Sequence, residues 1–351
     1  MKKCRYGKIK FCMPNVLKDT NYDPPRMIPS LVEGFNAVAN NVYLILFPIF
    51  LDLLFWLGPR FRVKQYFLPL VVEAAELSAA TYGEQAAGFV ETSREIWTAI
   101  LNQFNLFFSL KTFPVGIPSL LVSYITERNP WGMPISIEAT SGSMIATTAA
   151  ILMLVGVIIG SVYFAMVANA AVGRRPLDAS IILNQFMQTL ILSLILLVAS
   201  VLLALPISCL LSSLAMIMPS LGTFPFVVLG LMLVWVLLPL VFSPHGIFAG
   251  DLKATRSIVT SFRLVRSMTA ATGMFFIMLI IISYGLDFLW TTPAADSWLL
   301  LVGIFGHAFI SSGLLAASFK FYDQGVKWQQ QILQAHQIDQ SSAASSSDQS
   351  K

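Results

Sequence analysis

Two carboxylates and one imidazole lie inside long apolar stretches of this chain. Asp52 and Asp287 each lie toward the end of such a stretch, and His307 lies in a third. Ionisable groups in apolar segments are candidates for proton or ion chemistry, because placing them there is costly. For Asp52 we expect an interfacial ion pair with Arg60 or Arg62 instead. Asp287 can reach the interface by snorkelling, and a lone histidine is more often a packed core residue than a ligand.

Amide side chains form a second group of candidates, all near the same end of their apolar segments. They could line a polar cleft through which a solute passes. Hydrogen bonding between helices is the alternative, and we favour it. The candidate cleft residues are Asn40, Asn41, Asn169, Asn184 and Gln188.

Basic residues form a third group, on a helix expected over about 252–268 with Asp251 as its cap. At 100° per residue, one face carries Lys253, Arg256, Arg263 and Arg266, and the opposite face carries Ile258, Phe262, Val265 and Met268. We expect the apolar side to sink into the inner leaflet and the basic side to contact anionic lipid headgroups, at about 1 kcal/mol per charge. The alternative, which we favour, is a positive-inside anchor that only sets topology.

The motifs of common enzymes are missing from the sequence. The three histidines are far apart, no H-E-x-x-H, G-x-S-x-G or phosphate-binding glycine motif occurs, and the three cysteines lack metal or redox spacing. We therefore expect no catalytic residue, no cofactor and no metal site, and no enzymatic activity. The net charge of +4 is too small to indicate a nucleic-acid partner.

The amino-acid composition indicates whether these residues lie in a soluble or a membrane protein. Of 351 residues, 56% are hydrophobic and only 11% are charged, and the mean hydropathy is +0.74. A soluble domain has about 25% charged residues. The chain is therefore an integral membrane protein, and membrane lipids are its first expected partners, with other membrane subunits second.

Six apolar runs are long enough to cross a bilayer as helices, which predicts an all-α polytopic fold with additional amphipathic interfacial helices. Pro48 should kink the first, whose helix can begin earlier at the capping-box spacing of Ser30 and Glu33. Pro206 predicts that the third span is followed by a short interfacial helix. Gly156 and Gly160 predict close packing within the bundle. The six spans are 37–57, 145–169, 183–205, 224–243, 270–290 and 297–319.

Charge distribution predicts that both termini are cytoplasmic, because 16 of the 22 Lys and Arg then lie inside. The chain divides into a basic cytoplasmic arm (1–29), a first transmembrane helix (30–57), an extracytoplasmic helical insertion (58–144), the rest of the bundle (145–323) and a polar, partly disordered cytoplasmic tail (324–351). The expected location is a bacterial inner membrane.

The insertion between the first two spans contains glutamates and aromatic residues at helical spacing. They predict two amphipathic helices, 68–82 and 85–110, at the outer membrane surface. The next segment, 111–125, contains two prolines and is too short to span, which indicates a re-entrant or interfacial piece.

Two segments resemble known bacterial membrane proteins. Residues 236–280, with Ser261-Phe262-Arg263-Leu264 at their centre, resemble the six-span membrane domain fused to some glycerophosphodiester phosphodiesterases and related stand-alone proteins. Residues 30–61 resemble other prokaryotic membrane proteins. The resemblance covers about a third of the chain and implies six helices in a bacterial cell membrane. It does not imply phosphodiesterase activity, because the soluble catalytic domain is absent from this sequence.

Our leading hypothesis is a non-enzymatic scaffold, accessory subunit or lipid-handling protein, in which 68–125 covers a groove open to the outer leaflet. The alternative is a transporter or permease component for a hydrophobic or weakly polar solute, using the amide cleft. An intramembrane enzyme based on Asp52 or Asp287 is a third and weaker hypothesis.

Overall fold

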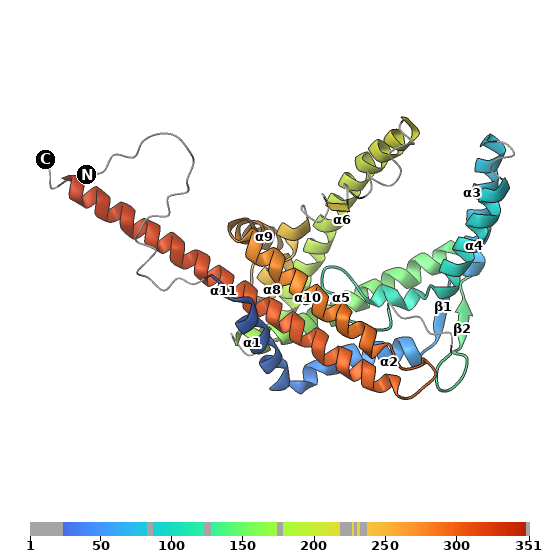
Figure 1. Cartoon of the computed structure of the whole chain (residues 1–351), viewed down its shortest axis with the longest axis horizontal. Coiled ribbons are helices and arrows are strands. Elements are labelled where there is room, and N and C mark those ends of the chain that lie inside the picture. The colour runs from blue at the N-terminus through green and yellow to red at the C-terminus, as the bar shows by residue number, and fades with distance from the viewer. Residues whose placement is uncertain are drawn as a thin grey trace.

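The protein is an all-α polytopic membrane protein (Figure 1). The computed structural model describes residues 24–82, 87–122, 128–173, 178–217 and 237–348, with Val227, Gly230 and Leu231. In chain order the α-helices are α1 (Met27–Ala39), α2 (Leu46–Leu57), α3 (Lys64–Tyr82), α4 (Ala87–Gln103), α5 (Gly142–Val172), α6 (Ala179–Ile217), α8 (Ser243–Gly250), α9 (Ala254–Ser267), α10 (Thr269–Trp290) and α11 (Leu300–Asp348). The short 3₁₀ helices are η2 (Val42–Ile45), η4 (Leu106–Leu110) and η6 (Leu238–Leu240).

Four of the described helices are apolar and long enough to cross a membrane. These are α5, α6, α10 and α11, and they correspond to the predicted second, third, fifth and sixth spans. A fifth candidate is the pair α1 and η2–α2, which is bent by 91°. The predicted fourth span, 224–243, lies mostly outside the described residues.

The first span is broken at Asn40–Asn41 rather than kinked at Pro48. Asn41 has a non-helical backbone (φ −135°, ψ 58°), and its side-chain amide donates to the Ala37 carbonyl of α1. Such local bonds compete with helix continuation. Pro48 lies in the first turn of α2, where its missing N–H costs little.

The early start of the first helix is confirmed, but the capping box is wrong. Helix α1 begins at Met27, so Ser30 lies within it, and its hydroxyl donates to the Arg26 carbonyl. The helix packs along α11, where Glu33 pairs with Lys320 at 3.2 Å. Gly34 permits this contact, because a Cβ there would collide with the backbone of Ala317.

Gly156 and Gly160 of α5 pack against the end of η4 and the non-helical segment that follows it, instead of a second α-helix. A Cβ on Gly156 would collide with the carbonyl oxygen of Leu110, and one on Gly160 with that of Val115. The predicted packing within the bundle is thus present, and its partners are Leu110 and the 111–122 segment. Val115, Ile117, Leu120 and Leu121 of this segment are buried, as non-helical backbone enclosed by protein at membrane depth requires, whereas Phe113 is 73% exposed.

Helix α6 continues through Pro206 to Ile217, so the short interfacial helix that we expected there is wrong. The five residues before Pro206 are Val, Leu and Ala, and the residues after it are Leu, Ile, Ala and Met with three serines and one cysteine. In lipid, a backbone that leaves the helical conformation exposes unpaired N–H and C=O groups, which costs more than the single hydrogen bond lost at proline.

The predicted amphipathic helices are present as the hairpin of α3 and α4, which extends away from the bundle (Figure 1). Helix α4 ends at Gln103, before the expected 110, because Asn105 accepts from Phe107 N–H and begins η4. Short strands β1 (Arg60–Arg62) and β2 (Ser136–Glu138) pair in parallel at the base of the hairpin.

The turn between α8 and α9 is held by two glutamines of α6. Asp251 has φ 50° and ends α8, so it is not the expected cap of α9. Its carboxylate accepts from Gln185 Nε2 at 3.0 Å. Gln188 instead caps α9, because its Oε1 accepts from Ala254 N–H at 2.9 Å.

Helix α9 packs on protein through a face that sequence reasoning did not anticipate. The buried residues include Ser257 and Ser261, whose hydroxyls donate to the carbonyls of Ser243 and Pro239 at 2.5 and 2.6 Å. Of the residues expected on the lipid-embedded side, Phe262 is 46% exposed, but Val265 and Met268 are buried in protein. Part of the predicted apolar face of α9 therefore packs on the bundle, beside two serines and Ala254 that allow a closer approach than larger residues would.

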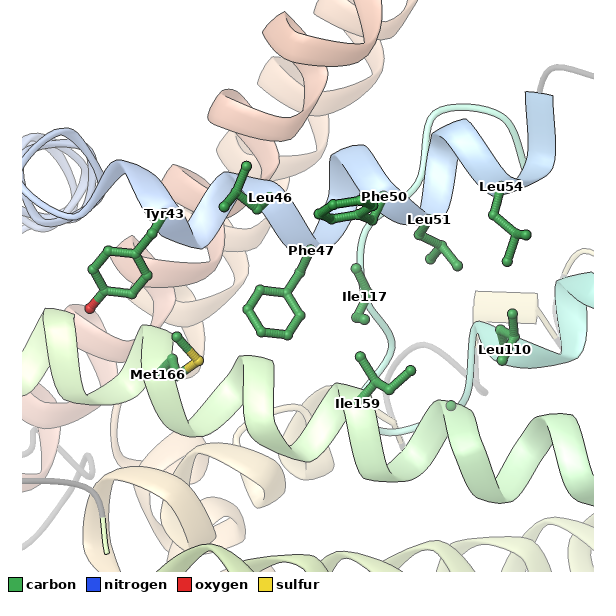
Figure 2. A pocket seen from close by; sticks show the side chains of 11 residues that line it. Tyr43, Leu46, Phe47, Phe50, Leu51, Leu54, Leu110, Ile117, Ile159 and Met166 are labelled. Atoms are coloured by element: carbon green, nitrogen blue, oxygen red, sulfur yellow. The ribbon is translucent and has the colours of Figure 1, made fainter. Parts of the chain in front are cut away.

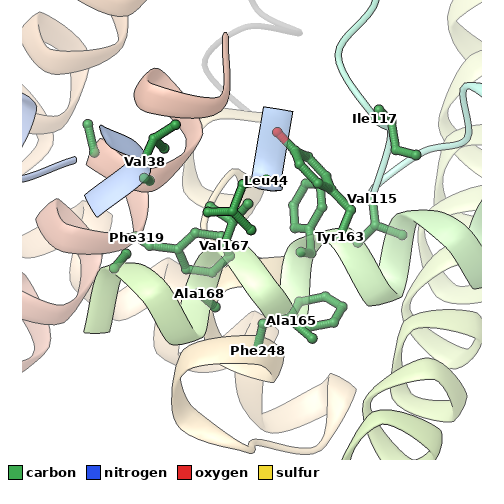
Figure 3. Close-up of a cluster of buried hydrophobic side chains, with 14 of the residues drawn as sticks. Val38, Leu44, Val115, Ile117, Tyr163, Ala165, Val167, Ala168, Phe248 and Phe319 are labelled. Atoms are coloured by element: carbon green, nitrogen blue, oxygen red, sulfur yellow. The ribbon is translucent and has the colours of Figure 1, made fainter. Parts of the chain in front are cut away.

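The main core lies where α5 crosses α1, α2, α8 and α11 (Figure 3). Tyr163 is fully buried and its hydroxyl shares a hydrogen bond with Ser312 of α11 at 2.9 Å. Phe319 packs against Phe164 from the opposite side. Helix α11 then extends beyond the core to Asp348, whereas we expected residues 324–351 to be partly disordered. The helix can continue because Val326–Asp348 contains no Gly or Pro.

Candidate functional site

An apolar groove of about 510 Å³ runs between α2 and α5 (Figure 2). We call it the α2–α5 groove. Its lining residues are Tyr43, Leu46, Phe47, Phe50, Leu51, Leu54, Leu110, Ile117, Gly156, Ile159 and Met166. Phe50 is 69% exposed, so the groove opens sideways between two candidate membrane spans, toward the lipid.

The groove is almost entirely apolar and has one polar group at one end. The hydroxyl of Tyr43 donates to Asn41 Oδ1 at 3.2 Å, beside the break between α1 and α2. In Figure 2, Phe47 points from α2 toward α5 and Ile159 points back from α5, with Ile117 between the two helices. An extended hydrocarbon would therefore contact side chains from three separate segments.

One wall of the groove is the 111–122 segment, and Asp52 of α2 anchors it. The Asp52 carboxylate is fully buried and accepts three hydrogen bonds, from Ser119 Oγ at 2.5 Å, Leu120 N at 3.2 Å and Leu121 N at 3.1 Å. Hydrogen bonds to a charged acceptor are about twice as strong as neutral ones. The bend of the chain that carries Ile117 is thus held to α2 by a single carboxylate.

Behind this anchor, His307 of α11 bridges the two acidic residues of the spans. Its Nδ1 lies 3.8 Å from Asp52 Oδ2, and its Nε2 lies 3.6 Å from Asp287 Oδ1. His307 is 5% exposed, whereas the Asp287 side chain is 32% exposed. We call Asp52, Ser119, Asp287 and His307 the charged cluster.

Lys111, which lies outside the spanning helices, adds a positive charge that interacts with the carboxylates of Asp52 and Asp287. Burial lowers the pKa of its amine, and the carboxylates of Asp52 and Asp287 act in the opposite direction. Together, the charged cluster and Lys111 combine two carboxylates, one ammonium and one titratable imidazole. The opposite charges limit the uncompensated charge inside the protein.

The geometry of the charged cluster favours anchoring over nucleophilic catalysis. In Ser-His-Asp hydrolases the hydroxyl bonds to the imidazole, which removes its proton. Here the Ser119 hydroxyl donates to the carboxylate of Asp52 instead. Within the described residues, no group of three or more His, Cys, Asp or Glu could hold a metal ion.

The structure places the amide residues in several different environments. Asn40 follows α1 and is exposed, Asn41 bonds to Ala37 and Tyr43, and Asn184 is exposed on α6. Gln188 caps α9, and Asn169 is half-buried near the end of α5. The side chains of Asn41 and Gln188 therefore have hydrogen bonds at the ends of helices.

The basic residues Lys253, Arg256, Arg263 and Arg266 all lie exposed on or beside α9. Asp52 was expected to pair with Arg60 or Arg62, but its hydrogen bonds are to the 111–122 segment, and Arg62 contacts Asn102 and Ser136.

Sequence reasoning treated Asp52, Asp287 and His307 one at a time and did not place them together. It also missed Ser119 and Ile117, which lie in a segment with no helical pattern. The available signal was that Asp52 and Asp287 both lie near the outer ends of their predicted spans, whereas His307 lies in the middle of its own. Comparisons of the chain with family models, curated proteins and solved structures found no match.

Proposed function

We propose that this protein is a non-enzymatic membrane protein that handles lipid, and that the α2–α5 groove holds an acyl chain. The observation that carries the proposal is an apolar groove of about 510 Å³ that opens sideways between α5, which is long enough to cross a bilayer, and α2, which is half of a bent candidate span. Small-molecule sites commonly measure about 300–1,000 Å³. A bilayer supplies hydrocarbon chains at high concentration to such an opening.

The composition of the groove supports a lipid chain over a polar solute. Only the Tyr43 hydroxyl offers a polar side-chain group, and it lies at one end beside Asn41. A chain that enters from the bilayer is already surrounded by hydrocarbon, so the groove would hold it by van der Waals packing rather than by removing methylenes from water. A chain in the groove would gain contacts with Phe47, Ile117 and Ile159, while a headgroup could meet Tyr43.

The same proposal includes a scaffold or accessory role for the α3–α4 hairpin. Helix α4 leaves Ile96, Trp97 and Ile100 exposed, and such a surface suits a membrane surface or a second membrane subunit. We propose a bacterial inner membrane with both termini cytoplasmic as the setting. The expected partners are membrane lipids and membrane subunits, without nucleic acid.

The groove is tested by filling it. Replacing Ile159→Trp should lower the amount of phospholipid that co-purifies with the full chain, measured by mass spectrometry of extracted lipids per mole of protein. The matched control is Ile158→Trp, because Ile158 lies on the same helix, is 44% exposed against 39% for Ile159, and does not line the groove. Equal lipid content in both variants would contradict the proposal.

A transporter or permease component is the second candidate function. The observation in its favour is the chain of ionisable groups from partly exposed Asp287 through His307 to buried Asp52, since intramembrane ionisable residues often mark ion or proton paths. If this chain of groups is the route, His307→Gln should abolish solute uptake into vesicles, because the imidazole lies between the two carboxylates. Unchanged uptake in this variant would exclude the route.

A further inference from the structure

A second cavity, separate from the α2–α5 groove, lies where α9 meets the beginning of α10. It measures about 320 Å³ and is lined by Leu238, Pro239, Phe262, Val265, Arg266 and Thr269. Thr269 is the first residue of α10, which is a candidate membrane span. The cavity therefore lies at the level where a spanning helix enters the membrane.

The exposed face of α9 beside this cavity is cationic. Arg256 and Arg263 are two turns apart on one side, and Arg266 follows Arg263 by three residues, so the three arginines lie along one surface. They are exposed and form no ion pair with any residue that the structure describes. Their positive charge is thus available to an external partner.

Apolar side chains lie among these charges. Phe262 and Val259 are each 46% exposed on the same side of α9, and Phe262 lines the cavity next to Arg266. The buried face of α9, with Ser257 and Ser261, holds the helix on η6 and α8. The three arginines therefore lie on a helix that is held in place by protein contacts, not on one that is bound only to the lipid leaflet.

We propose that this cavity is a specific site for one anionic phospholipid. Arg266, with Arg263 beside it, would bind the headgroup phosphate, and the beginning of an acyl chain would fill the space lined by Leu238, Phe262 and Val265. Arginine is well suited to phosphate because its planar guanidinium donates two parallel hydrogen bonds. The mixture of cation and apolar wall matches an anionic amphiphile at the membrane surface.

This site is distinct from a general positive-inside anchor, which would need only the charges. A specific site also needs the cavity, so two kinds of variant should weaken it. It does not depend on the groove of the proposed function, because the two cavities share no lining residue.

The test is native mass spectrometry of the full detergent-purified protein, titrated with phosphatidylglycerol or phosphatidylcholine. Wild-type protein should bind phosphatidylglycerol more strongly. Arg266→Gln should weaken that binding about fivefold, the effect of roughly one charge near the surface, and leave phosphatidylcholine unchanged. Arg94→Gln is the control, because it removes the same charge from the distant helix α4.

The cavity itself is tested with Thr269→Trp, which fills it from an exposed position, against Thr255→Trp, which lies exposed on α9 outside the cavity. Only the former should reduce phosphatidylglycerol binding. Equal affinity for both lipids, or no effect of Arg266→Gln and Thr269→Trp, would overturn the proposal. The groove variant Ile159→Trp should leave the preference for phosphatidylglycerol intact, which separates failure of this site from failure of the groove.

Discussion

The two buried histidines of the bundle, His307 and His245, have opposite kinds of partner. His307 lies between the carboxylates of Asp52 and Asp287. His245 of α8 shares a hydrogen bond with Ser318 at 2.7 Å and packs against Phe242 and Phe319. His307 belongs to α11, and His245 contacts Ser318 of the same helix, about 16 Å further along its axis at 1.5 Å per residue.

The difference shows how one bundle uses polar groups in two ways. Around His245 the partners are uncharged hydroxyls and aromatic rings, and they join helices α8 and α11. In the charged cluster, the Asp52 carboxylate ties the non-helical 111–122 segment to α2, where the backbone N–H groups of Leu120 and Leu121 need an acceptor. Of these two buried centres, the charged one satisfies a loop and the neutral one joins two helices.

The largest effect should come from removing the charged anchor. Asp52→Ala leaves the Ser119 hydroxyl and two backbone N–H groups without their acceptor, so we expect a loss of about 3–5 kcal/mol in the free energy of unfolding. Thermal unfolding in detergent measures it. Asp52→Asn keeps one acceptor oxygen and should lose less. An unchanged melting temperature for Asp52→Ala would show that the 111–122 segment is held by other contacts.

Near His245, where the partners are uncharged, we expect stability to depend on close packing rather than on charge. In Gly246→Ala the new methyl group would collide with Ser257 Oγ, at a cost of up to about 3 kcal/mol. Ser257→Ala removes that oxygen, so the double variant should be more stable than the two single losses predict. Simple additivity in this cycle of unfolding measurements would argue against the α8–α9 contact.

Two serine substitutions compare the charged cluster directly with the surroundings of His245. Ser119→Ala removes a hydrogen bond to a carboxylate and should cost about 2 kcal/mol, whereas Ser318→Ala removes one to an imidazole and should cost about 1 kcal/mol. Both are measured as shifts in thermal unfolding of the purified chain. The reverse order would remove the distinction between a charged and a neutral centre.

The smallest effect is expected at the solvent-facing member of the charged cluster. Asp287 is 32% exposed, so Asp287→Asn should change the free energy of unfolding by less than about 1 kcal/mol. The same unfolding assay checks it, beside Asp52→Asn. A loss as large as that of Asp52→Asn would mean that Asp287 is as essential as the buried anchor.

Much of the helical framework could be predicted, because apolar runs of sufficient length have few other conformations in lipid. The runs at 145–169 and 270–290 became α5 and α10 with ends moved by only a few residues. The predictions were wrong where a polar side chain could form hydrogen bonds with either a local or a distant partner. Asn41 broke a span by bonding to Ala37, and Gln188 took the capping role expected of Asp251.

The sequence by itself determined the solvent of this protein, since no arrangement of so few charges could cover the surface of a soluble fold. It also determined which stretches are helical, because a backbone in lipid must satisfy its own hydrogen bonds. Only the tertiary structure decided that Asp52, Ser119, Asp287 and His307 meet, and that Gly156 and Gly160 admit a loop beside the groove. These contacts join residues far apart in the chain, and they depend on shape and distance, which periodicity does not encode.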